Sequence, residues 1–242
     1  MDSALSFSIL DSVDSTNNYA MGRVHAGLAK HGMAWFAMNQ TAGKGQRSKL
    51  WESEPGMNII MSITLSHQYY DLANTFSQNA AIAICVKDFL NSQTGDSFTI
   101  KWPNDIYWRD RKAGGILIEN VIRGDKWLWS VIGIGINVNQ VNFPENLKNP
   151  VSLKQITGKL SDPVDMARIL HHSILQTVQV PADFIIRRYN DSLYKRGQSV
   201  KFKKGAIIFH GKVDHVDQFG QLHIYTNMEE IFNFGEVEWV VD

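Results

Sequence analysis

Residues Trp127–Val138 read WLWSVIGIGINV, and this stretch decides the fold. Successive side chains of a β-strand point to opposite faces, so one face is aliphatic and the other bears Gly133 and Gly135. The aliphatic face is expected to pack on helices. Glycine inside a strand often marks a close approach of a ligand, so these glycines are predicted to floor a pocket; the alternative is close packing of other groups over them. Asn137 and Asn139 continue the glycine face and are expected to donate hydrogen bonds at its rim.

Strand and helix patterns occur on both sides of this stretch. Strands are predicted at residues 7–13, 35–38, 57–65, 98–101, 106–108 and 115–121, and helices after the capping cluster Asp14-Ser15-Thr16-Asn17 and at residues 71–90, 161–178 and 182–194. The mixture predicts an α/β or α+β fold. After Gly197, short strand-like runs separated by glycines predict a small all-β barrel. We therefore expect two domains, residues 1–195 and 196–242.

The cysteine, the histidines and one helix suggest structural positions rather than chemistry. The single cysteine, Cys85, rules out a disulfide framework and lies in an apolar helix pattern, so it is expected in the core. The histidines lack metal-ligand spacing, and surface positions are expected for His171, His172, His210, His215 and His223. The helix that begins at Ser161-Asp162-Pro163 is expected to bury a stripe formed by Met166, Ile169, Leu170, Ile174 and Val178.

The composition excludes several classes of protein. The chain has 242 residues, is 44% hydrophobic, and balances 24 Lys and Arg against 24 Asp and Glu. A zero net charge argues against a protein that coats nucleic acid or an acidic membrane, although residues 187–212 carry a net +7 and residues 213–242 a net −7. No apolar run approaches the ~18 residues of a membrane span. The N-terminus lacks a basic secretory signal, so a cytoplasmic protein is expected.

The stretch Gln40–Trp51, QTAGKGQRSKLW, suits an anionic ligand. Two glycines allow the backbone to approach a ligand closely, and three basic side chains precede the first acid. It is neither a P-loop, because Gly45 stands where that motif has Ser or Thr after its lysine, nor a dinucleotide fingerprint, because Ser48 replaces the third glycine. A flexible basic surface loop is the alternative.

A second polar stretch is Lys101-Trp102-Pro103-Asn104-Asp105, followed by Arg111-Lys112-Ala113-Gly114-Gly115. Pro103 ends a strand, and a hairpin around residues 109–111 returns the chain to the same sheet. A carboxylate, an amide and a lysine are therefore expected to meet at the strand ends, where they form a plausible reactive site. A solvated hairpin is the alternative.

Taken together, the order and spacing of these stretches resemble the biotin protein ligase family. An early Ser-Thr-Asn turn precedes the glycine loop that ends in Trp, and Lys-Trp-Pro-Asn-Asp, Arg-Lys-x-x-Gly-Ile-Leu and Gly-x-Gly-Ile-Asn follow. The resemblance spans about residues 7–139. It implies a mixed-sheet catalytic domain related to class II aminoacyl-tRNA synthetases and to biotin and lipoate ligases, followed by an SH3-like barrel.

The resemblance also implies a reaction. ATP with Mg²⁺ activates biotin to biotinyl-5′-AMP and pyrophosphate, and a specific lysine of a biotin carboxyl carrier domain then takes the biotin. Catalytic roles are implied for Lys112, Asp105 and Arg47. Biotin contacts are implied for Ser15, Thr16, Asn17, Gln40, Gly43, Lys44, Gly45, Lys112, Gly115, Gly133 and Gly135. ATP or adenylate contacts are implied for Arg47, Lys49, Trp51, Asn104, Lys112 and Asn137.

The chemistry agrees with these roles. Joining a carboxylate to an α-phosphate brings two anions together, so cations are needed. Lys112, the basic loop and Mg²⁺ are expected to supply them, with Mg²⁺ held mainly by the ATP phosphates and not by protein ligands. Asp105 is expected to orient the acceptor amine and to accept its proton.

This sequence departs from the family in the glycine loop, which reads Gly-Lys-Gly-Gln-Arg-Ser and not Gly-Arg-Gly-Arg-Arg-Gly. Lys44 keeps the charge without the planar fork of arginine, Gln46 loses a charge, and Ser48 replaces a glycine. These departures from the pattern of the resembled family bear on the expected order of the loop and retention of the adenylate, not on the expected reaction class. Because Phe7 already begins the catalytic strand, no DNA-binding domain is expected; a homodimer through a sheet edge is compatible with the family.

Two other functions remain open at this point. A lipoate–protein ligase shares the fold and the reaction logic, but Lys-Trp-Pro-Asn-Asp and the basic glycine loop disfavour it. A non-catalytic module whose SH3-like barrel binds a peptide or nucleic acid would use the basic residues of 187–212. Salt-dependent nucleic-acid binding without biotin-stimulated ATP–pyrophosphate exchange would indicate such a module.

Overall fold

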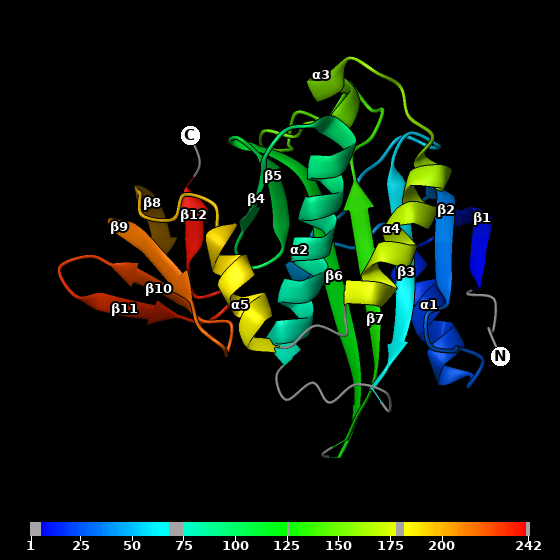
Figure 1. Cartoon of the computed structure of the whole chain (residues 1–242), viewed down its shortest axis with the longest axis horizontal. Coiled ribbons are helices and arrows are strands. Elements are labelled where there is room, and N and C mark those ends of the chain that lie inside the picture. Colours follow the sequence, from blue (N-terminus) through cyan, green and yellow to red (C-terminus); the bar gives the residue numbers. More distant parts are fainter. Residues whose placement is uncertain (1–5, 68–74, 125, 178–181, 241–242) are drawn as a thin grey trace.

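The computed structural model describes residues 6–67, 75–124, 126–177 and 182–240. Within them lie a seven-stranded sheet in the order β1-β2-β3-β7-β6-β5-β4 and a five-stranded sheet in the order β11-β10-β9-β8-β12 (Figure 1). The large sheet comprises β1 (Phe7–Val13), β2 (Ala34–Gln40), β3 (Ile59–Ser66), β4 (Phe98–Lys101), β5 (Asp105–Trp108), β6 (Arg111–Arg123) and β7 (Lys126–Ile136). The small sheet comprises β8 (Ser199–Lys204), β9 (Ile207–Val216), β10 (Leu222–Tyr225), β11 (Glu229–Phe232) and β12 (Glu238–Val240).

The helices separate these strands along the chain. They are α1 (Thr16–His25), the short 3₁₀ turn η1 (Gln46–Ser48), α2 (Thr75–Thr94), α3 (Leu153–Thr157), α4 (Pro163–Thr177) and α5 (Ala182–Asp191). Within the large sheet β1 and β2 run parallel, and the other neighbours are antiparallel. The mixed α/β class is confirmed, as are the strand at residues 7–13 and the hairpin around residues 109–111. The predicted helix start at residues 71–74 lies outside the described residues.

One face of the large sheet packs on α2 and α4, which cross in front of it in Figure 1. Ile132, Ile134 and Ile136 of β7 are at most 2% exposed in this core, so the predicted packing of the aliphatic face is confirmed. Cys85 on α2 is buried, and its burial raises the pKa of the thiol to about 11. A thiol with a raised pKa is a weak nucleophile at neutral pH, so Cys85 acts as a core residue.

The prediction for the buried stripe of α4 is wrong at Ile169, which is 53% exposed. The buried positions include Met166, Leu170 and Ile174, four residues apart, so they form one line along the helix. Ile169 is rotated by about 100° from its neighbour Leu170 and therefore faces solvent. His171 lies on the buried side, contrary to its predicted surface position, and its Nε2 is 2.8 Å from the Gly32 carbonyl oxygen. The remaining predicted position, Val178, lies outside the described residues.

The opposite face of the large sheet is only partly covered by a helix. α1 packs on β2, β3 and β7, where Ala20, Val24, Trp35 and Val131 form a small buried cluster. Beyond α1, the face formed by β7, β6 and β5 is covered by the glycine-rich loop that follows β2. This half of the sheet face, covered by the loop and by no helix among the described residues, holds the predicted site.

The small sheet is tied to the large one through α5. Asn190 of α5 exchanges two hydrogen bonds with the backbone of Val216 in β9, at 2.7 and 2.8 Å. Tyr189 of the same helix lies edge-on to Phe76 of α2, with ring centroids 5.3 Å apart. His223 of β10 is also buried, against its predicted surface position, and its Nδ1 is 2.8 Å from a Glu229 carboxylate oxygen. The division into domains at residues 195 and 196 stays a prediction.

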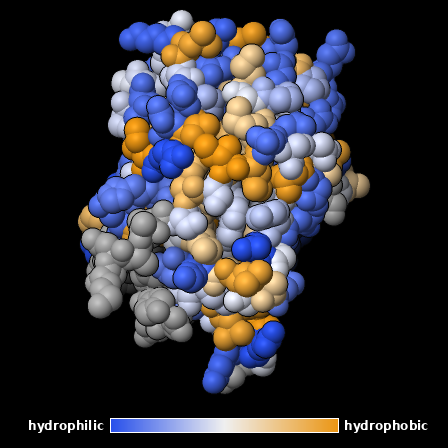
Figure 2. All heavy atoms as spheres, turned by 90° about the vertical axis from the view of Figure 1, so that its right-hand side faces the viewer, coloured by the Kyte–Doolittle hydropathy of each residue, from blue (hydrophilic) through white to orange (hydrophobic). Residues whose placement is uncertain are grey.

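The surface around β1 and the helices bear on whether the molecule has an interface or a membrane span. The side of the molecule that carries the edge strand β1 shows apolar side chains among polar ones (Figure 2), and Ile9 of β1 is 44% exposed. None of the helices in the described part of the chain combines the length and the apolar character that a membrane span requires.

Candidate active site

The floor of the candidate site is a row of glycines on adjacent strands. Gly135 of β7 is the Cα partner of Gly115 of β6, which in turn pairs with Asp105 of β5. Paired residues of neighbouring strands project on the same face of a sheet. Gly133 lies two residues before Gly135 on the same face. The missing side chains therefore leave a trough in the sheet, which we call the glycine trough: Gly115, Gly133 and Gly135.

An ion pair lies over one end of the glycine trough. The Nζ atom of Lys112 is 2.6 Å from Oδ1 of Asp105, and both side chains are about 30% exposed. A Cβ atom on Gly115 would lie 3.3 Å from Lys112 Nζ and 3.4 Å from Asp105 Oδ1, so the pair rests directly on this glycine. The backbone of Lys112 is held by hydrogen bonds with Asn149 and Val151. The predicted meeting of a lysine and a carboxylate is thus present.

Trp51 covers the middle of the glycine trough. A Cβ atom on Gly135 would lie 2.6 Å from Cζ2 of Trp51, so only glycine accepts the indole in this position. Lys112 Nζ is 5.7 Å from the centre of a Trp51 ring. The indole Nε1 of Trp51 is buried and makes no hydrogen bond with the described residues. A buried donor without a partner is costly, which suits a group that receives its partner from a ligand.

The loop that carries Trp51 is a compact hairpin. The backbone N–H of Trp51 donates to the Gly43 carbonyl oxygen at 2.9 Å, and that of Gly45 donates to the Lys49 carbonyl oxygen at 2.7 Å. Both glycines lie against the returning strand of the hairpin: a Cβ atom on Gly43 would overlap the Trp51 carbonyl oxygen, and one on Gly45 would lie 3.2 Å from the Lys49 carbonyl oxygen. Lys44 and Lys49 are exposed. We call residues 43–51 the basic hairpin.

A network of buried polar side chains lies at the other end of the glycine trough. The Thr16 backbone N–H donates to Gln40 Oε1 at 2.8 Å. The Ser62 hydroxyl lies 2.8 Å from Thr16 Oγ1 and 2.6 Å from Asn17 Oδ1. Asn17 Nδ2 donates to Glu119 Oε2 at 2.8 Å. A Cβ atom on Gly133 would overlap the amide of Asn17, so Gly133 is covered by Asn17. Thr16, Asn17 and Gln40 therefore lie in one hydrogen-bonded network, and their contact with a ligand stays a prediction.

Four other residues considered from the sequence form hydrogen bonds with the backbone of neighbouring segments. The side chain of Asn104 donates to the Ile116 carbonyl oxygen, and that of Asn137 donates to the Val151 carbonyl oxygen at 3.2 Å. Asn139 exchanges two hydrogen bonds with the backbone of Ser161. Ser15 is buried at the N-terminus of α1 and accepts from the Tyr19 backbone N–H. Asn104 and Asn137 thus brace the strands beneath Lys112 in this structure.

Arg47 lies apart from the rest of the predicted site. It stands at the tip of the basic hairpin with φ 54°, and its guanidinium lies against Phe234 of the small sheet, not against Lys112. The hairpin thus spans the distance between the glycine trough and the small sheet.

Three residues near the trough were not singled out from the sequence. Ser62 and Glu119 join the polar network, and the signal for Ser62 is a polar residue between the apolar Met61 and Ile63 of β3. Lys101 is the Cα partner of Asp105, and its Nζ donates to the Tyr107 hydroxyl at 3.1 Å. Burial lowers the pKa of Lys101 to about 8; the Asp105 carboxylate opposes this shift, and neighbouring lysines including Lys112 add to it. This end of the trough therefore brings two lysines, Lys101 and Lys112, next to one carboxylate, Asp105.

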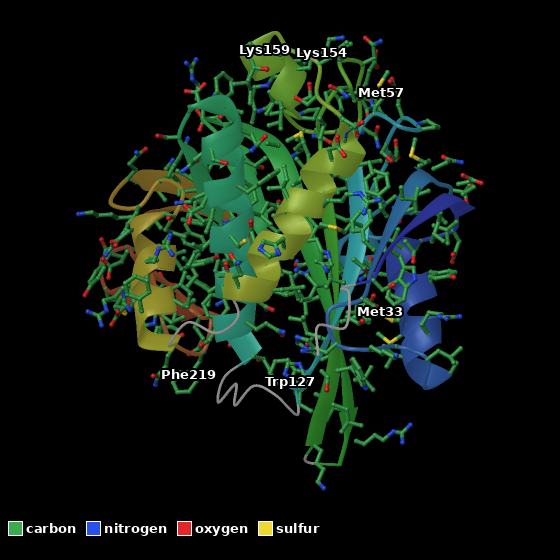
Figure 3. All side chains as sticks on the ribbon, turned by 45° about the vertical axis from the view of Figure 1, so that its right-hand side comes forward. Met33, Met57, Trp127, Lys154, Lys159 and Phe219 are labelled. Carbon is green, nitrogen blue, oxygen red and sulfur yellow. The ribbon has the colours of Figure 1, made fainter. Side chains whose placement is uncertain are left out.

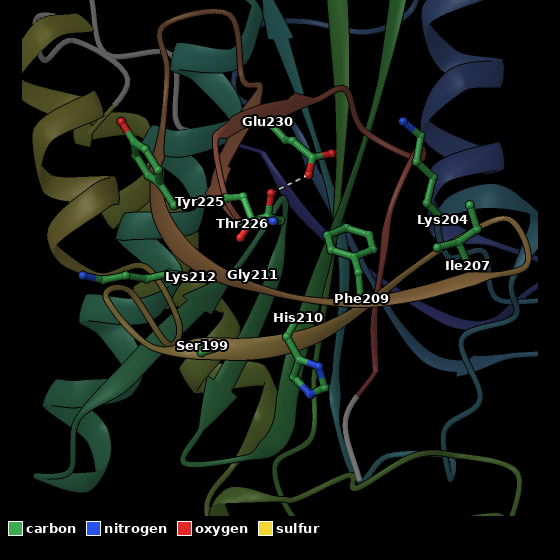
Figure 4. Close-up of a pocket in the computed structure, with 11 residues that line it drawn as sticks. Ser199, Lys204, Ile207, Phe209, His210, Gly211, Lys212, Tyr225, Thr226 and Glu230 are labelled. Atoms are coloured by element: carbon green, nitrogen blue, oxygen red, sulfur yellow. Dashed lines mark hydrogen bonds between the residues drawn. The ribbon is translucent and has the colours of Figure 1, made fainter.

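A groove of about 740 Å³ lies elsewhere, on the small sheet (Figure 4). Lys204 and Lys212 stand at its two ends and Phe209 between them. None of the predicted site residues lines this groove, and it has a different set of side chains from the glycine trough.

The fold and the site have the features expected of a protein that takes an anionic small molecule on the face of a mixed sheet. Glycine backbone forms the floor, Lys112 and Lys101 supply positive charge, and a basic hairpin covers the site. A model of the biotin/lipoate A/B protein ligase family matches residues 9–137, more than half of the chain. The chain belongs to this family.

Individual relatives support the family assignment. The bifunctional ligase/repressor BirA of Bacillus subtilis is 31% identical over 209 residues, which cover 82% of this chain and 63% of that protein, so the chain spans less than two thirds of it. The biotin–[acetyl-CoA-carboxylase] ligase of Paracoccus denitrificans is 32% identical over 171 residues, 67% of this chain and 68% of that protein. The structure of biotin protein ligase from Aquifex aeolicus in complex with biotin and ATP has a TM-score of 0.80 at 26% identity, over 97% of this chain and 99% of that one.

Proposed function

We propose that this protein is a biotin protein ligase, an enzyme that activates biotin with ATP and transfers it to a lysine of a biotin carboxyl carrier protein. The observation that carries the proposal is the position of Lys112, on the glycine trough between Asp105 and Trp51. The match to the Aquifex aeolicus biotin protein ligase, which holds biotin and ATP, extends over nearly the whole of both chains and supports the same assignment.

In the first half-reaction, an oxygen of the biotin carboxylate attacks the α-phosphorus of ATP and pyrophosphate leaves. Both reactants are anions, and their approach requires fixed positive charge. Lys112 is assigned the contact with the carboxylate and the α-phosphate, and Lys44 and Lys49 of the basic hairpin would add charge. Arg47 would add charge from farther away, at the hairpin tip against Phe234. The Trp51 indole, with its unpartnered Nε1, is placed to contact the adenylate.

The biotin ring system is assigned to the other end of the trough. Thr16 and Gln40 are hydrogen bonded to each other there, Asn17 is joined to Thr16 through the Ser62 hydroxyl, and Ser15 is buried next to Thr16. A polar network that is ordered before the ligand arrives loses less entropy on binding. The biotin site would be lined by the backbone of five glycines: Gly115, Gly133, Gly135, Gly43 and Gly45. Asn104 and Asn137 would hold the nucleotide.

In the second half-reaction, the acceptor lysine amine attacks the acyl carbon of biotinyl-5′-AMP, AMP leaves, and an amide forms. A free lysine has a pKa near ~10.4, so its deprotonation at pH 7 costs about 4.6 kcal/mol. Asp105 is the carboxylate at the trough and is assigned the role of orienting the amine and accepting its proton. The basic hairpin would exclude water, which otherwise hydrolyses the anhydride.

Magnesium fits this site only as a companion of ATP. Among the described residues no group of three or more His, Cys, Asp or Glu side chains is placed to hold a metal ion. Mg²⁺ would therefore be held mainly by the ATP phosphates, with Asn104 as the nearest predicted protein contact. When bound, it neutralises phosphate charge and favours the departure of pyrophosphate.

Biotin-dependent exchange of labelled pyrophosphate into ATP tests the proposal. Exchange with biotin and none with lipoate is expected, and thermal stabilisation by biotin in preference to lipoate should accompany it. Exchange with lipoate alone would identify a lipoate ligase. Salt-dependent binding of nucleic acid without any exchange would identify a binding module.

Three further assignments belong to this proposal. The acceptor is a biotin carboxyl carrier domain, the protein acts in the cytoplasm without binding DNA or a membrane, and a homodimer through the exposed edge strand β1 is compatible with its apolar surface. Sedimentation at several concentrations tests the oligomeric state.

A further inference from the structure

The tip of the basic hairpin reaches the small sheet. Arg47 belongs to the 3₁₀ turn η1 at this tip, and its Cζ lies 5.0 Å from the centre of the Phe234 ring. This geometry is that of a cation–π contact. Phe234 lies between β11 and β12, so a residue near the C-terminus contacts a loop near the N-terminus.

The neighbouring glycine makes room for the contact. A Cβ atom on Gly235 would lie 2.6 Å from Cζ of Arg47 and would overlap its guanidinium. Gly235 also has φ 96°, a conformation that side chains other than glycine rarely adopt. The missing side chain at Gly235 therefore leaves the space that the guanidinium of Arg47 occupies.

Phe234 is itself connected to the strand that carries Asp105. Its ring lies edge-on to Trp102, with ring centroids 6.0 Å apart. Trp102 is 3% exposed, and its Nε1 donates to the Gly220 carbonyl oxygen of the small sheet at 2.9 Å. Arg47, Phe234 and Trp102 form a continuous chain of contacts from the hairpin tip to the residues beside Asp105.

The base of the same hairpin covers the site. Trp51 lies over Gly135, and the backbone N–H of Trp51 is bonded to Gly43. Because bridges between Lys44 and Leu50 and between Gly45 and Lys49 make the hairpin one unit, a restraint at its tip is transmitted to its base.

We propose that Phe234 is a positioning residue of this active site: its ring seats Arg47 and thereby holds the basic hairpin closed over the glycine trough. The small sheet is then part of the enclosure that retains biotinyl-5′-AMP. The role in adenylate retention rests on the proposed function, whereas the contact between Arg47 and Phe234 does not.

The size of the effect follows from the exposure of the pair. Phe234 is 48% exposed and Arg47 is exposed. A cation–π contact at an exposed site changes an opening equilibrium about two- to fivefold. A change of this size in the opening equilibrium suits a hairpin that must open to admit the carrier domain.

Limited trypsin digestion tests the contact without any ligand, because Lys44, Arg47 and Lys49 are all in the hairpin. Phe234→Leu removes the π face and keeps an apolar side chain; cleavage in the hairpin should rise about two- to fivefold, since cleavage follows the open population when opening is fast. Phe234→Tyr should restore the wild-type rate. The matched control is Phe219→Leu, a 70% exposed aromatic that Figure 3 shows at the lower edge of the molecule. It should cleave like the wild type.

A second readout tests the role in the reaction. In single turnover from preformed adenylate, Phe234→Leu should raise the fraction lost to hydrolysis by the same two- to fivefold factor, and Phe234→Tyr should not. Equal cleavage of Phe234→Leu and wild type, or an increase that Phe219→Leu reproduces, overturns the contact. Increased cleavage without increased hydrolysis overturns the positioning role. Because digestion needs no biotin, a wild type without pyrophosphate exchange would contradict the proposed function alone.

Discussion

Gly133→Ala is the substitution whose effect the geometry defines most sharply. The added Cβ would overlap Oδ1 of Asn17 and lie 2.9 Å from its Cγ, where ordinary contacts begin at 3.4 Å. Asn17 must therefore move by more than half an ångström, and its hydrogen bonds to Ser62 at 2.6 Å and Glu119 at 2.8 Å are lost together.

The free-energy cost follows from these two bonds. A neutral hydrogen bond contributes about 0.5–1.5 kcal/mol and one to a charged group about 1.5–3 kcal/mol. Replacing glycine by alanine inside a strand returns about 0.5–1 kcal/mol. The free energy of unfolding of Gly133→Ala should thus fall by about 1–4 kcal/mol, which for a chain of this size lowers Tm by roughly 5–10 °C at the middle of that range.

The assay is urea unfolding of a double-mutant cycle with Asn17→Ala. In the Asn17→Ala background the overlap is gone, so Gly133→Ala should be neutral or stabilise by about 0.5–1 kcal/mol. Gly22→Ala is the control in α1: nothing lies within 4 Å of its added Cβ, so it should stabilise the helix by about 1 kcal/mol. Equal destabilisation by Gly133→Ala in both backgrounds would refute the reasoning.

Three further predictions concern the lysines and the carboxylate. Lys112→Ala should abolish biotin-dependent pyrophosphate exchange, a loss of at least about 10²–10³-fold if it removes one preorganised cation; a rate within tenfold of wild type contradicts its role. Asp105→Ala should mainly slow transfer from preformed adenylate, and normal single-turnover transfer excludes Asp105 as the proton acceptor. Lys101 has its folded pKa lowered to about 8, so the unfolded chain binds more protons between pH 8 and about 10.5 and stability should rise with pH across that window. The Lys101→Met variant should lack this rise in urea unfolding, and parallel curves for the two proteins contradict the burial of a charged Lys101.

Patterns local in the sequence predicted the local structure well. The alternation in residues 127–138 placed the isoleucines in the core and the glycines on the site face, because side-chain direction in a strand depends only on position parity. The glycines were predicted to floor a pocket, with side-chain packing over them as the alternative. In the structure Asn17 and Trp51 lie over Gly133 and Gly135, so side chains pack over these glycines as in the alternative.

Local sequence patterns did not predict the contacts between segments that are distant in the sequence. Nothing in the order of residues indicates that Arg47 rests on Phe234 or that Asn17 meets Glu119. These contacts depend on the strand order, in which β7 and β6 lie between β3 and β5. The error at Ile169 has a related origin. When a helix has apolar residues on more than one side, the neighbouring elements decide which side is buried, and tertiary packing sets those neighbours.

The ion pair between Lys112 and Asp105 links the two proposed half-reactions. In the structure Asp105 neutralises Lys112 at 2.6 Å, so neither group has its full charge available to a ligand. Biotin and ATP bring anions that compete for Lys112, and the pair is partly exposed, so its separation costs little. In the proposed reaction, an anion bound at Lys112 would weaken the pair with Asp105 and leave that carboxylate more available to the acceptor amine. Formation of the adenylate would therefore prepare the base for the next step, and Asp105→Asn should uncouple the two, because it leaves Lys112 cationic while removing the proton acceptor.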